Sequence, residues 1–258
     1  MKNVFAIAWV TVREALRQKL AVNLLVFAIA LVAASLVLSS LTYGEQYRII
    51  VDIALTAMEV FGTLIAVFLG AGLVAGDVQR RTVYAIVAKP VSRAQYVTGR
   101  YTGLVITTTL NLAVMAVVFA AVLAAYLRGV GFLWQTPFLA TIGAIALQLA
   151  MVAAVAVLFS TFTTSTLAAI FTLSLVVAGH VASDLARYWP REGAAAGWIG
   201  KALYLAVPNL EALNLKEAMI YKDTVAAGPL VASFAYGILY AAGVTALAAA
   251  VFTRRDLR

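Results

Sequence analysis

The stretch from Gly76 to Tyr101 reads GDVQRRTVYAIVAKPVSRAQYVTGRY and interrupts a first half that is otherwise mostly apolar. It carries a single carboxylate, Asp77, and five cations. These cations are Arg80, Arg81, Lys89, Arg93 and Arg100. The apolar runs on both sides exceed the roughly 20 residues that a helix needs to cross a bilayer. The stretch therefore predicts a loop at the membrane surface, and its charge favours the cytoplasmic side.

The composition predicts an integral membrane protein. Of the 258 residues, 64% are hydrophobic and 12% are charged, and the mean hydropathy is +0.98. Soluble domains carry roughly 25% charged residues. The net charge of +8 does not indicate a nucleic-acid partner, because the cations lie in loops beside apolar runs and not on one contiguous face. Contact of these loops with anionic lipid headgroups accounts for the same charge.

Cysteine is absent and histidine occurs once, at His180. The chain can therefore form no disulfide and offers no thiolate ligand or cysteine nucleophile. One imidazole also argues against a histidine-built metal centre. We expect no metal site, no cofactor and no catalytic residue in this chain.

Hydropathy predicts an all-α membrane protein with one domain over residues 1–258. An amphipathic helix is expected over residues 1–20, lying in the membrane interface with Trp9 at headgroup level. Six transmembrane helices follow. They are expected at about Ala21–Leu41, Ile50–Ala75, Gly103–Leu127, a fourth ending near Phe159, a fifth reaching Asp184, and Pro229–Phe252. The extracytoplasmic segment 185–228 is expected to form short interfacial helices. Its charges predict that it is solvated: Arg187, Arg191, Glu192, Lys201, Glu211, Lys216 and Glu217. A gate at the outer mouth, a docking surface for an extracytoplasmic partner and a plain solvated cap are open alternatives for it.

Six spans place both termini on one side of the membrane. That side carries twelve Lys and Arg residues: four in the N-terminal helix, five in the 76–101 segment and three in the C-terminal tail. The other side carries seven. This bias predicts that both termini and the 76–101 segment are cytoplasmic.

Within the 76–101 segment the sequence predicts a rigid helix–turn–helix. Pro90 ends a short helix expected over residues 82–88. Ser92 stands three residues before Gln95, which is the spacing of a capping box at the start of the next helix. Three glycines at the end of the preceding span predict close helix packing: Gly70, Gly72 and Gly76.

At these residues the sequence resembles the permease subunits of type-two ATP-binding-cassette exporters. Their loop has an acidic residue, then Thr-Leu, then Pro with a small polar residue and Arg, and later Gly-Lys. The matching positions are Asp77, Thr82, Pro90, Ser92, Arg93, Gly99 and Arg100. The departures are Asp77 in place of Glu, Arg81 in place of Gly, Val83 in place of Leu and Arg100 in place of Lys. The N-terminal helix, the six spans and a Pro-Asn element at Pro208 and Asn209 are also similar to that class, which includes the copper-processing permeases of nitrous oxide reductase maturation.

The resemblance implies a non-catalytic permease subunit in the bacterial cytoplasmic membrane. The sequence has no G-x-x-x-x-G-K-[ST] phosphate loop, so ATP and Mg²⁺ would be bound by a separate ATPase subunit. A second permease copy, identical or related, is also implied. The residues implied to couple to the ATPase are Asp77, Arg80, Arg81, Thr82, Pro90, Ser92, Arg93, Gly99 and Arg100.

Glu59 places a carboxylate within the second expected span. Such a placement costs at least about 2.5 kcal/mol, so the side chain should face protein or water. It lies on a polar and small-residue stripe that could line a translocation path or bind a substrate cation: Asp52, Thr56, Glu59, Thr63, Ala66 and Gly70. The alternative is a protonated carboxyl that is hydrogen-bonded to a neighbouring helix.

Other polar residues in the expected spans have a simpler interpretation. His180 and Asp184 lie one turn apart and could transfer a proton, although a buried hydrogen-bonding role for His180 is the simpler reading. Hydroxyls and an amide in the third span are expected to bond to carbonyls of the preceding turn or to another helix: Thr107, Thr108, Thr109 and Asn111. Tyr236 and Tyr240 are expected to pack.

Two other functions stay open at this point. A mechanical subunit would use cytoplasmic ATP to drive an extracytoplasmic partner, and it predicts ATP consumption with no transported species. A membrane-embedded lipid-modifying enzyme would use Glu59, His180 or Asp184 as acid–base groups, and it predicts turnover by the isolated chain.

Overall fold

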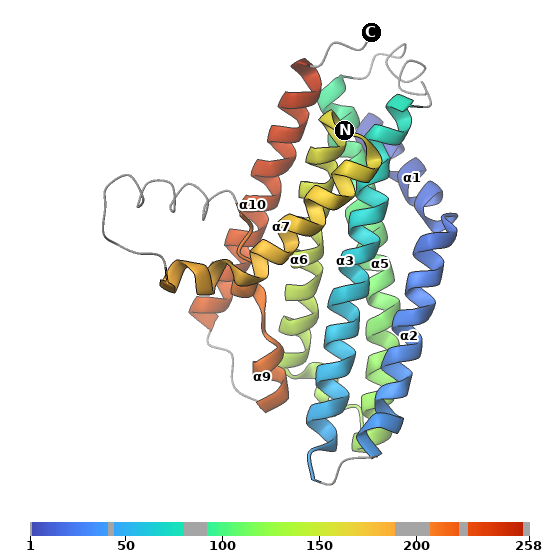
Figure 1. Ribbon diagram of the computed structural model, residues 1–258. Helices are drawn as coiled ribbons and strands as arrows, with labels where there is room; N and C mark the ends of the chain where they lie inside the picture. Colours follow the sequence, from blue (N-terminus) through green and yellow to red (C-terminus); the bar gives the residue numbers. More distant parts are fainter. Residues whose placement is uncertain (1, 41–43, 80–91, 189–206, 222–226, 255–258) are drawn as a thin grey trace.

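A computed structural model describes residues 2–40, 44–79, 92–188, 207–221 and 227–254, and all regular structure in these residues is helical (Figure 1). The predicted all-α class is therefore confirmed. The elements are α1 (Lys2–Leu16), α2 (Lys19–Ser40), α3 (Gln46–Gln79), α5 (Arg93–Leu127), η1 (Gly131–Trp134), α6 (Thr136–Phe162), α7 (Ser165–Tyr188), η2 (Glu211–Leu213), α9 (Lys216–Tyr221) and α10 (Ala227–Arg254).

Five of the described helices are long and apolar enough to cross a membrane: α2, α3, α5, α6 and α10. They coincide with five of the six predicted spans. The remaining one, the predicted fifth span reaching Asp184, corresponds to α7, in which Ser165–Val181 is a shorter apolar stretch within the residues whose side chains are described. Figure 1 shows α7 inclined across the bundle, unlike the other long helices. The described chain thus has the character of a multi-pass membrane protein.

Helix α3 is central, since it packs against α2, α5, α6 and α7. Two of its glycines permit this packing. A Cβ atom at Gly62 would lie 2.8 Å from Leu149 Cδ1, and one at Gly70 would lie 2.6 Å from Ala156 Cβ. Gly70 therefore makes the close contact with α6 that was predicted. Gly72 and Gly76 do not, because nothing lies within 4 Å of a Cβ at either position.

Helix α1 packs along α5 through two glycines four residues apart. A Cβ at Gly99 would lie 2.8 Å from Ile7 Cβ, and one at Gly103 would lie 2.6 Å from the carbonyl oxygen of Ala8. Such small-residue spacing lets two helices approach closely. The buried face of α1 consists of Ala8, Thr11, Val12 and Ala15.

The predicted amphipathic pattern of α1 is only partly correct. Phe5 and Trp9 are 71% and 52% exposed, as a membrane-facing surface requires. Ala8 and Val12, which helical spacing also places on the apolar face of the predicted amphipathic helix, are instead buried. The helix therefore has two apolar faces, one of small residues toward α5 and one of large residues outward.

The start of α5 confirms the predicted capping box. The Ser92 hydroxyl accepts a hydrogen bond from the backbone N–H of Gln95, and the Gln95 side chain accepts one from the backbone N–H of Ser92, each at 3.2 Å. The capped helix and the predicted third span form one continuous helix.

Gly103→Ala should destabilise the fold by about 1–3 kcal/mol, because the added methyl group overpacks the contact with α1. The matched control is Gly72→Ala, which adds the same methyl group within α3 where there is space, and should be neutral or stabilising by up to about 1 kcal/mol. Thermal unfolding of the purified variants in one detergent compares them. Equal effects of the two substitutions would contradict the assigned α1–α5 contact.

Candidate functional site

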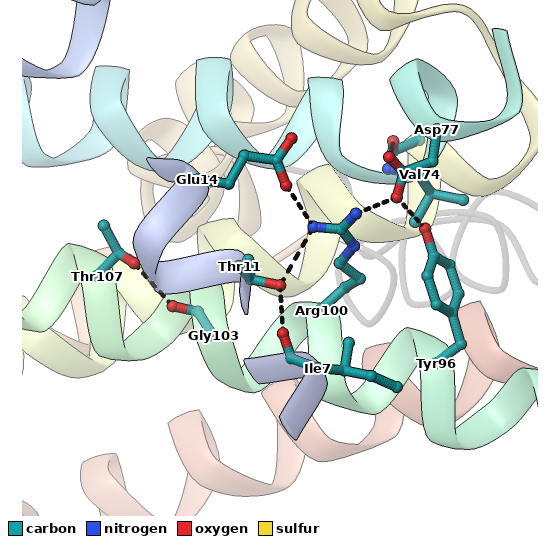
Figure 2. A network of polar contacts seen from close by, with 10 residues as sticks. Ile7, Thr11, Glu14, Val74, Asp77, Tyr96, Arg100, Gly103 and Thr107 are labelled. Carbon is teal, nitrogen blue, oxygen red and sulfur yellow. Dashed lines mark hydrogen bonds and ion pairs between the residues drawn. The ribbon is translucent and has the colours of Figure 1, made fainter. Parts of the chain in front are cut away.

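The guanidinium of Arg100 joins three helices at the end of the bundle where α3 stops and α5 begins (Figure 2). Arg100 lies on α5 and is 5% exposed. Its Nη1 donates to Glu14 Oε2 of α1 at 2.7 Å and to the Thr11 hydroxyl at 3.3 Å. Its Nη2 forms an ion pair with Asp77 Oδ2 of α3. We call Thr11, Glu14, Asp77, Tyr96 and Arg100 the arginine cluster.

Tyr96 completes the arginine cluster one turn before Arg100. Its hydroxyl donates to the same Asp77 oxygen. The guanidinium carbon also lies 5.7 Å from the centroid of the Tyr96 ring, within the range of a cation–π contact. Asp77 is only 8% exposed, so a buried carboxylate is matched by a buried cation and a hydroxyl donor. Buried charges require such pairing.

Three residues that the sequence assigned to ATPase coupling lie within or beside the arginine cluster. Asp77, Gly99 and Arg100 are buried inside this chain and do not form a surface of it. Arg93 donates to the Thr253 carbonyl at the end of α10 at 3.2 Å, and Ser92 caps α5. The remaining coupling residues, Arg80, Arg81, Thr82 and Pro90, lie outside the described residues.

A second polar cluster surrounds Glu59, about 27 Å along α3 from Asp77. Glu59 is 8% exposed, and both of its carboxylate oxygens are engaged. Oε1 lies 2.9 Å from His180 Nε2 of α7, and Oε2 forms an ion pair with Lys216 Nζ at the start of α9. The Lys216 ammonium also lies 3.5 Å from the Thr56 hydroxyl. We call Thr56, Glu59, His180 and Lys216 the glutamate cluster.

Both ring nitrogens of His180 face oxygen atoms. Nε2 faces the Glu59 carboxylate, and Nδ1 lies 3.0 Å from the carbonyl oxygen of Val176. A neutral imidazole can donate from only one nitrogen, whereas the imidazolium donates from both. The geometry thus allows His180 to hold a proton against Glu59. His180 contacts Glu59, and the Asp184 side chain of the predicted His180–Asp184 pair lies outside the described part of the chain.

The segment 207–221 enters the bundle and carries Lys216 with it. The backbone N–H of Leu210 donates to the Gly179 carbonyl at 3.3 Å, and Gln148 Nε2 donates to the Leu210 carbonyl at 2.8 Å. Leu210, Leu213 and Met219 are buried. Backbone groups away from water need partners within the protein, and these bonds supply them.

Two further bonds fix the segment. The backbone N–H of Asn209 donates to the Tyr236 hydroxyl at 2.8 Å, and the Thr141 hydroxyl donates to the Leu215 carbonyl at 3.2 Å. The prediction of a solvated cap is therefore wrong for Lys216, whose side chain is 20% exposed and bound to Glu59. Glu211 and Glu217 are exposed, as predicted. Tyr236 does more than pack, because its hydroxyl anchors Asn209.

The members of the predicted stripe on α3 differ in their surroundings. Thr56 and Glu59 meet in the glutamate cluster, and Thr63 is half-buried one turn further on. Ala66 is buried, Gly70 packs on α6, and Asp52 is exposed at the other end. Among the described side chains, the potential metal ligands that meet in the glutamate cluster are Glu59 and His180. No group of three such side chains occurs in the described ranges.

The hydroxyls of the third predicted span have the structural role that was favoured. Thr107 donates to the Gly103 carbonyl at 2.9 Å, and Thr108 donates to the Leu104 carbonyl at 3.1 Å. The Asn111 amide donates to the Thr107 carbonyl at 3.0 Å. These side chains satisfy carbonyls of their own helix and leave the two clusters as the candidate functional centres.

Four residues of the two clusters were missed by the sequence: Thr11, Glu14, Tyr96 and Lys216. Tyr96 precedes Arg100 by four residues, so helical spacing alone places them on one face. Glu14 is the one carboxylate of the N-terminal helix and a natural partner for a buried cation. No local pattern distinguishes Lys216 from the other charges of the 185–228 segment.

A comparison with protein families gives one match. The family described as "Protein of unknown function (DUF2705)" matches residues 44–258. The chain belongs to this family. In this DUF2705 protein the match includes the Asp77–Arg100 pair and the whole glutamate cluster, whereas Thr11 and Glu14 precede it. No curated protein matches the chain.

Arg100→Gln should lower the free energy of unfolding by about 3–5 kcal/mol, because it leaves the Asp77 carboxylate buried without its cation. The matched control is Arg93→Gln, which removes one hydrogen bond at a less buried position and should cost about 1 kcal/mol. Denaturant unfolding of both variants gives the comparison. The double variant Asp77→Asn/Arg100→Gln should be more stable than Arg100→Gln alone. The assignment fails if the two arginine variants are equally stable.

Proposed function

We propose that this DUF2705 protein is the permease subunit of an ATP-binding-cassette exporter in a bacterial cytoplasmic membrane. It would be non-catalytic, and a separate ATPase subunit would bind ATP and Mg²⁺. Helix α7 would complete six spans, and both termini would lie in the cytoplasm with the 80–91 segment. The pathway would form between this chain and a second permease copy.

The arginine cluster is the observation that carries this proposal. The 80–91 segment leaves the end of α3 and returns at the start of α5, and the Asp77–Arg100 pair ties these two ends together. Glu14 adds α1 to the same joint. A force applied to the segment would therefore reach three helices at once. The energy would come from ATP, because helices cannot shift their own equilibrium without a ligand that favours one state.

The outward face of α1 supports its place in the cytoplasmic interface. Phe5 and Trp9 are exposed, and the Arg13 guanidinium lies 5.6 Å from the centroid of the Trp9 ring. Aromatic rings with basic neighbours suit the boundary between lipid tails and headgroups. In that position α1 would follow the bilayer surface while Glu14 holds it to α5.

A mechanical subunit that drives an extracytoplasmic partner is the second candidate. The observation in its favour is that α3 reaches the 207–221 segment through Glu59–Lys216 and through the Tyr47 hydroxyl, which donates to the Met219 carbonyl at 3.1 Å. Movement of α3 would then act on the 207–221 segment, which lies outside the three helices that the arginine cluster joins. Reconstituted vesicles separate the two candidates, because only the exporter moves a solute. A lipid-modifying enzyme receives less support, because Glu59 has both carboxylate oxygens engaged.

The proposal predicts that a phosphate-loop ATPase encoded beside this chain co-purifies with it. Replacing residues 80–91 with a neutral Gly/Ser linker of equal length should abolish the complex, because the cationic contact is lost. Replacing residues 222–226 in the same way is the matched control and should leave the complex intact. Affinity purification in a mild detergent measures how much ATPase is recovered with the wild-type chain and with each of the two replacement variants.

Absence of any such ATPase from the purified complex would contradict the proposal. Retention of the ATPase after replacement of residues 80–91 would show that the contact lies elsewhere. Because the chain has no cysteine, single cysteines placed in each segment also report which side of the membrane it faces.

A further inference from the structure

We infer that the glutamate cluster is a recognition site for an ammonium group, that Lys216 occupies it in this conformation, and that the exported substrate carries a protonated amine. This inference rests on the proposed function and specifies the substrate class. It follows from the geometry of the site, from the element that supplies Lys216, and from the charges that remain when Lys216 leaves.

The surroundings of the Lys216 ammonium form the site. An ammonium group has three donors and needs acceptors around it. Glu59 Oε2 supplies the opposite charge, and the Thr56 hydroxyl lies 3.5 Å from Nζ. Both acceptors lie on α3, one turn apart. Any primary amine on a slender alkyl chain presents the same donors as Lys216.

Lys216 and its two acceptors lie on different elements. Lys216 is carried by the 207–221 segment, whose backbone bonds go to Gly179 of α7, Gln148 of α6 and Tyr236 of α10. Helix α3 also reaches this segment near its other end, where the Tyr47 hydroxyl donates to the Met219 carbonyl and Arg48 donates to the Tyr221 hydroxyl. A displacement of α3 relative to α6, α7 and α10 would therefore withdraw Glu59 from Lys216 and break these two bonds, but it would leave the bonds of the segment to the other three helices intact.

The vacated site would favour a cation. Glu59 is buried, and a buried carboxylate without its cation is strongly unfavourable. His180 remains on Oε1 and can hold a proton there, which limits this penalty during exchange. A substrate ammonium could then take the place of the Lys216 ammonium, whereas a carboxylate or a neutral alcohol could not.

The accessibility of the site agrees with this exchange. Thr56 is exposed and the His180 side chain is 38% exposed, so the glutamate cluster lies at the edge of the bundle and not within its core. In a complex of two permease copies this edge can face the shared pathway. Lys216 then acts as a tethered competitor that neutralises Glu59 whenever no substrate is bound.

Chemical rescue of Lys216→Ala tests the inference. The full-length chain in lipid nanodiscs is titrated with n-butylammonium, with 1-butanol and with butyrate, and the unfolding temperature is measured. We expect the unfolding temperature to fall on substitution and to be restored saturably by butylammonium only, because a ligand that binds the folded state stabilises it. The wild-type chain should require at least about ten-fold more amine, because Lys216 competes for Glu59.

Two further variants make the result specific. Glu59→Gln/Lys216→Ala should lose the response to butylammonium, and Lys216→Arg, which keeps a cation, should behave like the wild type. If Lys216→Ala does not fold, the amine response of the wild-type chain is compared with that of Glu59→Gln, and only the wild type should respond. Equal stabilisation by butanol, or a response that survives Glu59→Gln, overturns the inference and leaves a purely structural ion pair.

The assay needs no ATPase, so its outcome is separable from that of the proposed function. A negative amine response in a chain that still binds its ATPase would refute the substrate class alone. Loss of the ATPase partnership with a positive amine response would refute the exporter and leave an ammonium site.

Discussion

One buried cation sets the architecture of the α3–α5 end of the bundle. The Arg100 guanidinium is out of contact with solvent and therefore needs acceptors within the protein, which come from Asp77 of α3 and from Glu14 and Thr11 of α1. The close approach of α1 at Gly99 and Gly103 brings these acceptors within reach. Separating α3 from α5 is costly because it breaks the buried Asp77–Arg100 ion pair. Separating α1 removes the second ion pair of Arg100, with the partly exposed Glu14. The ends of α1, α3 and α5 that meet beside the 80–91 segment are thus expected to move together as one unit.

Helix α3 links this unit to the glutamate cluster. Asp77 and Glu59 lie roughly 27 Å apart on one regular helix. A displacement of α3 at one cluster would therefore be transmitted to the other. The two clusters differ in one respect that matters for function. The acceptors of Arg100 lie on helices that the arginine cluster binds together, whereas Lys216 lies on a segment that is anchored to α6, α7 and α10 as well as to α3. The arginine cluster therefore favours joint movement of α1, α3 and α5. In the glutamate cluster, movement of α3 would change the contacts of Glu59.

Much of the fold follows from local signals in the sequence. Apolar length predicted six spanning helices, five of which coincide with described helices long and apolar enough to cross a membrane, and the Ser92–Gln95 spacing predicted the start of α5. Partners far apart in the sequence could not be predicted, because nothing local specifies that Glu14 meets Arg100 or that Lys216 meets Glu59. The charge on Lys216 predicted a solvent-exposed side chain, but this side chain instead pairs with the buried Glu59 carboxylate. Glu59 and His180 were identified singly, but their direct contact joins two helices whose packing only the structure reveals.

The distance between α1 and α3 in the working complex tests the central claim most directly. Spin labels on Val10→Cys and Gln79→Cys, two exposed positions in a chain without other cysteines, report it by pulsed electron paramagnetic resonance. If the arginine cluster makes α1, α3 and α5 one unit, the distance distribution stays narrow and keeps its mean when the ATPase is trapped with nucleotide, and Arg100→Gln broadens it. A nucleotide-dependent shift in the wild type, or an unchanged distribution in Arg100→Gln, would contradict the account.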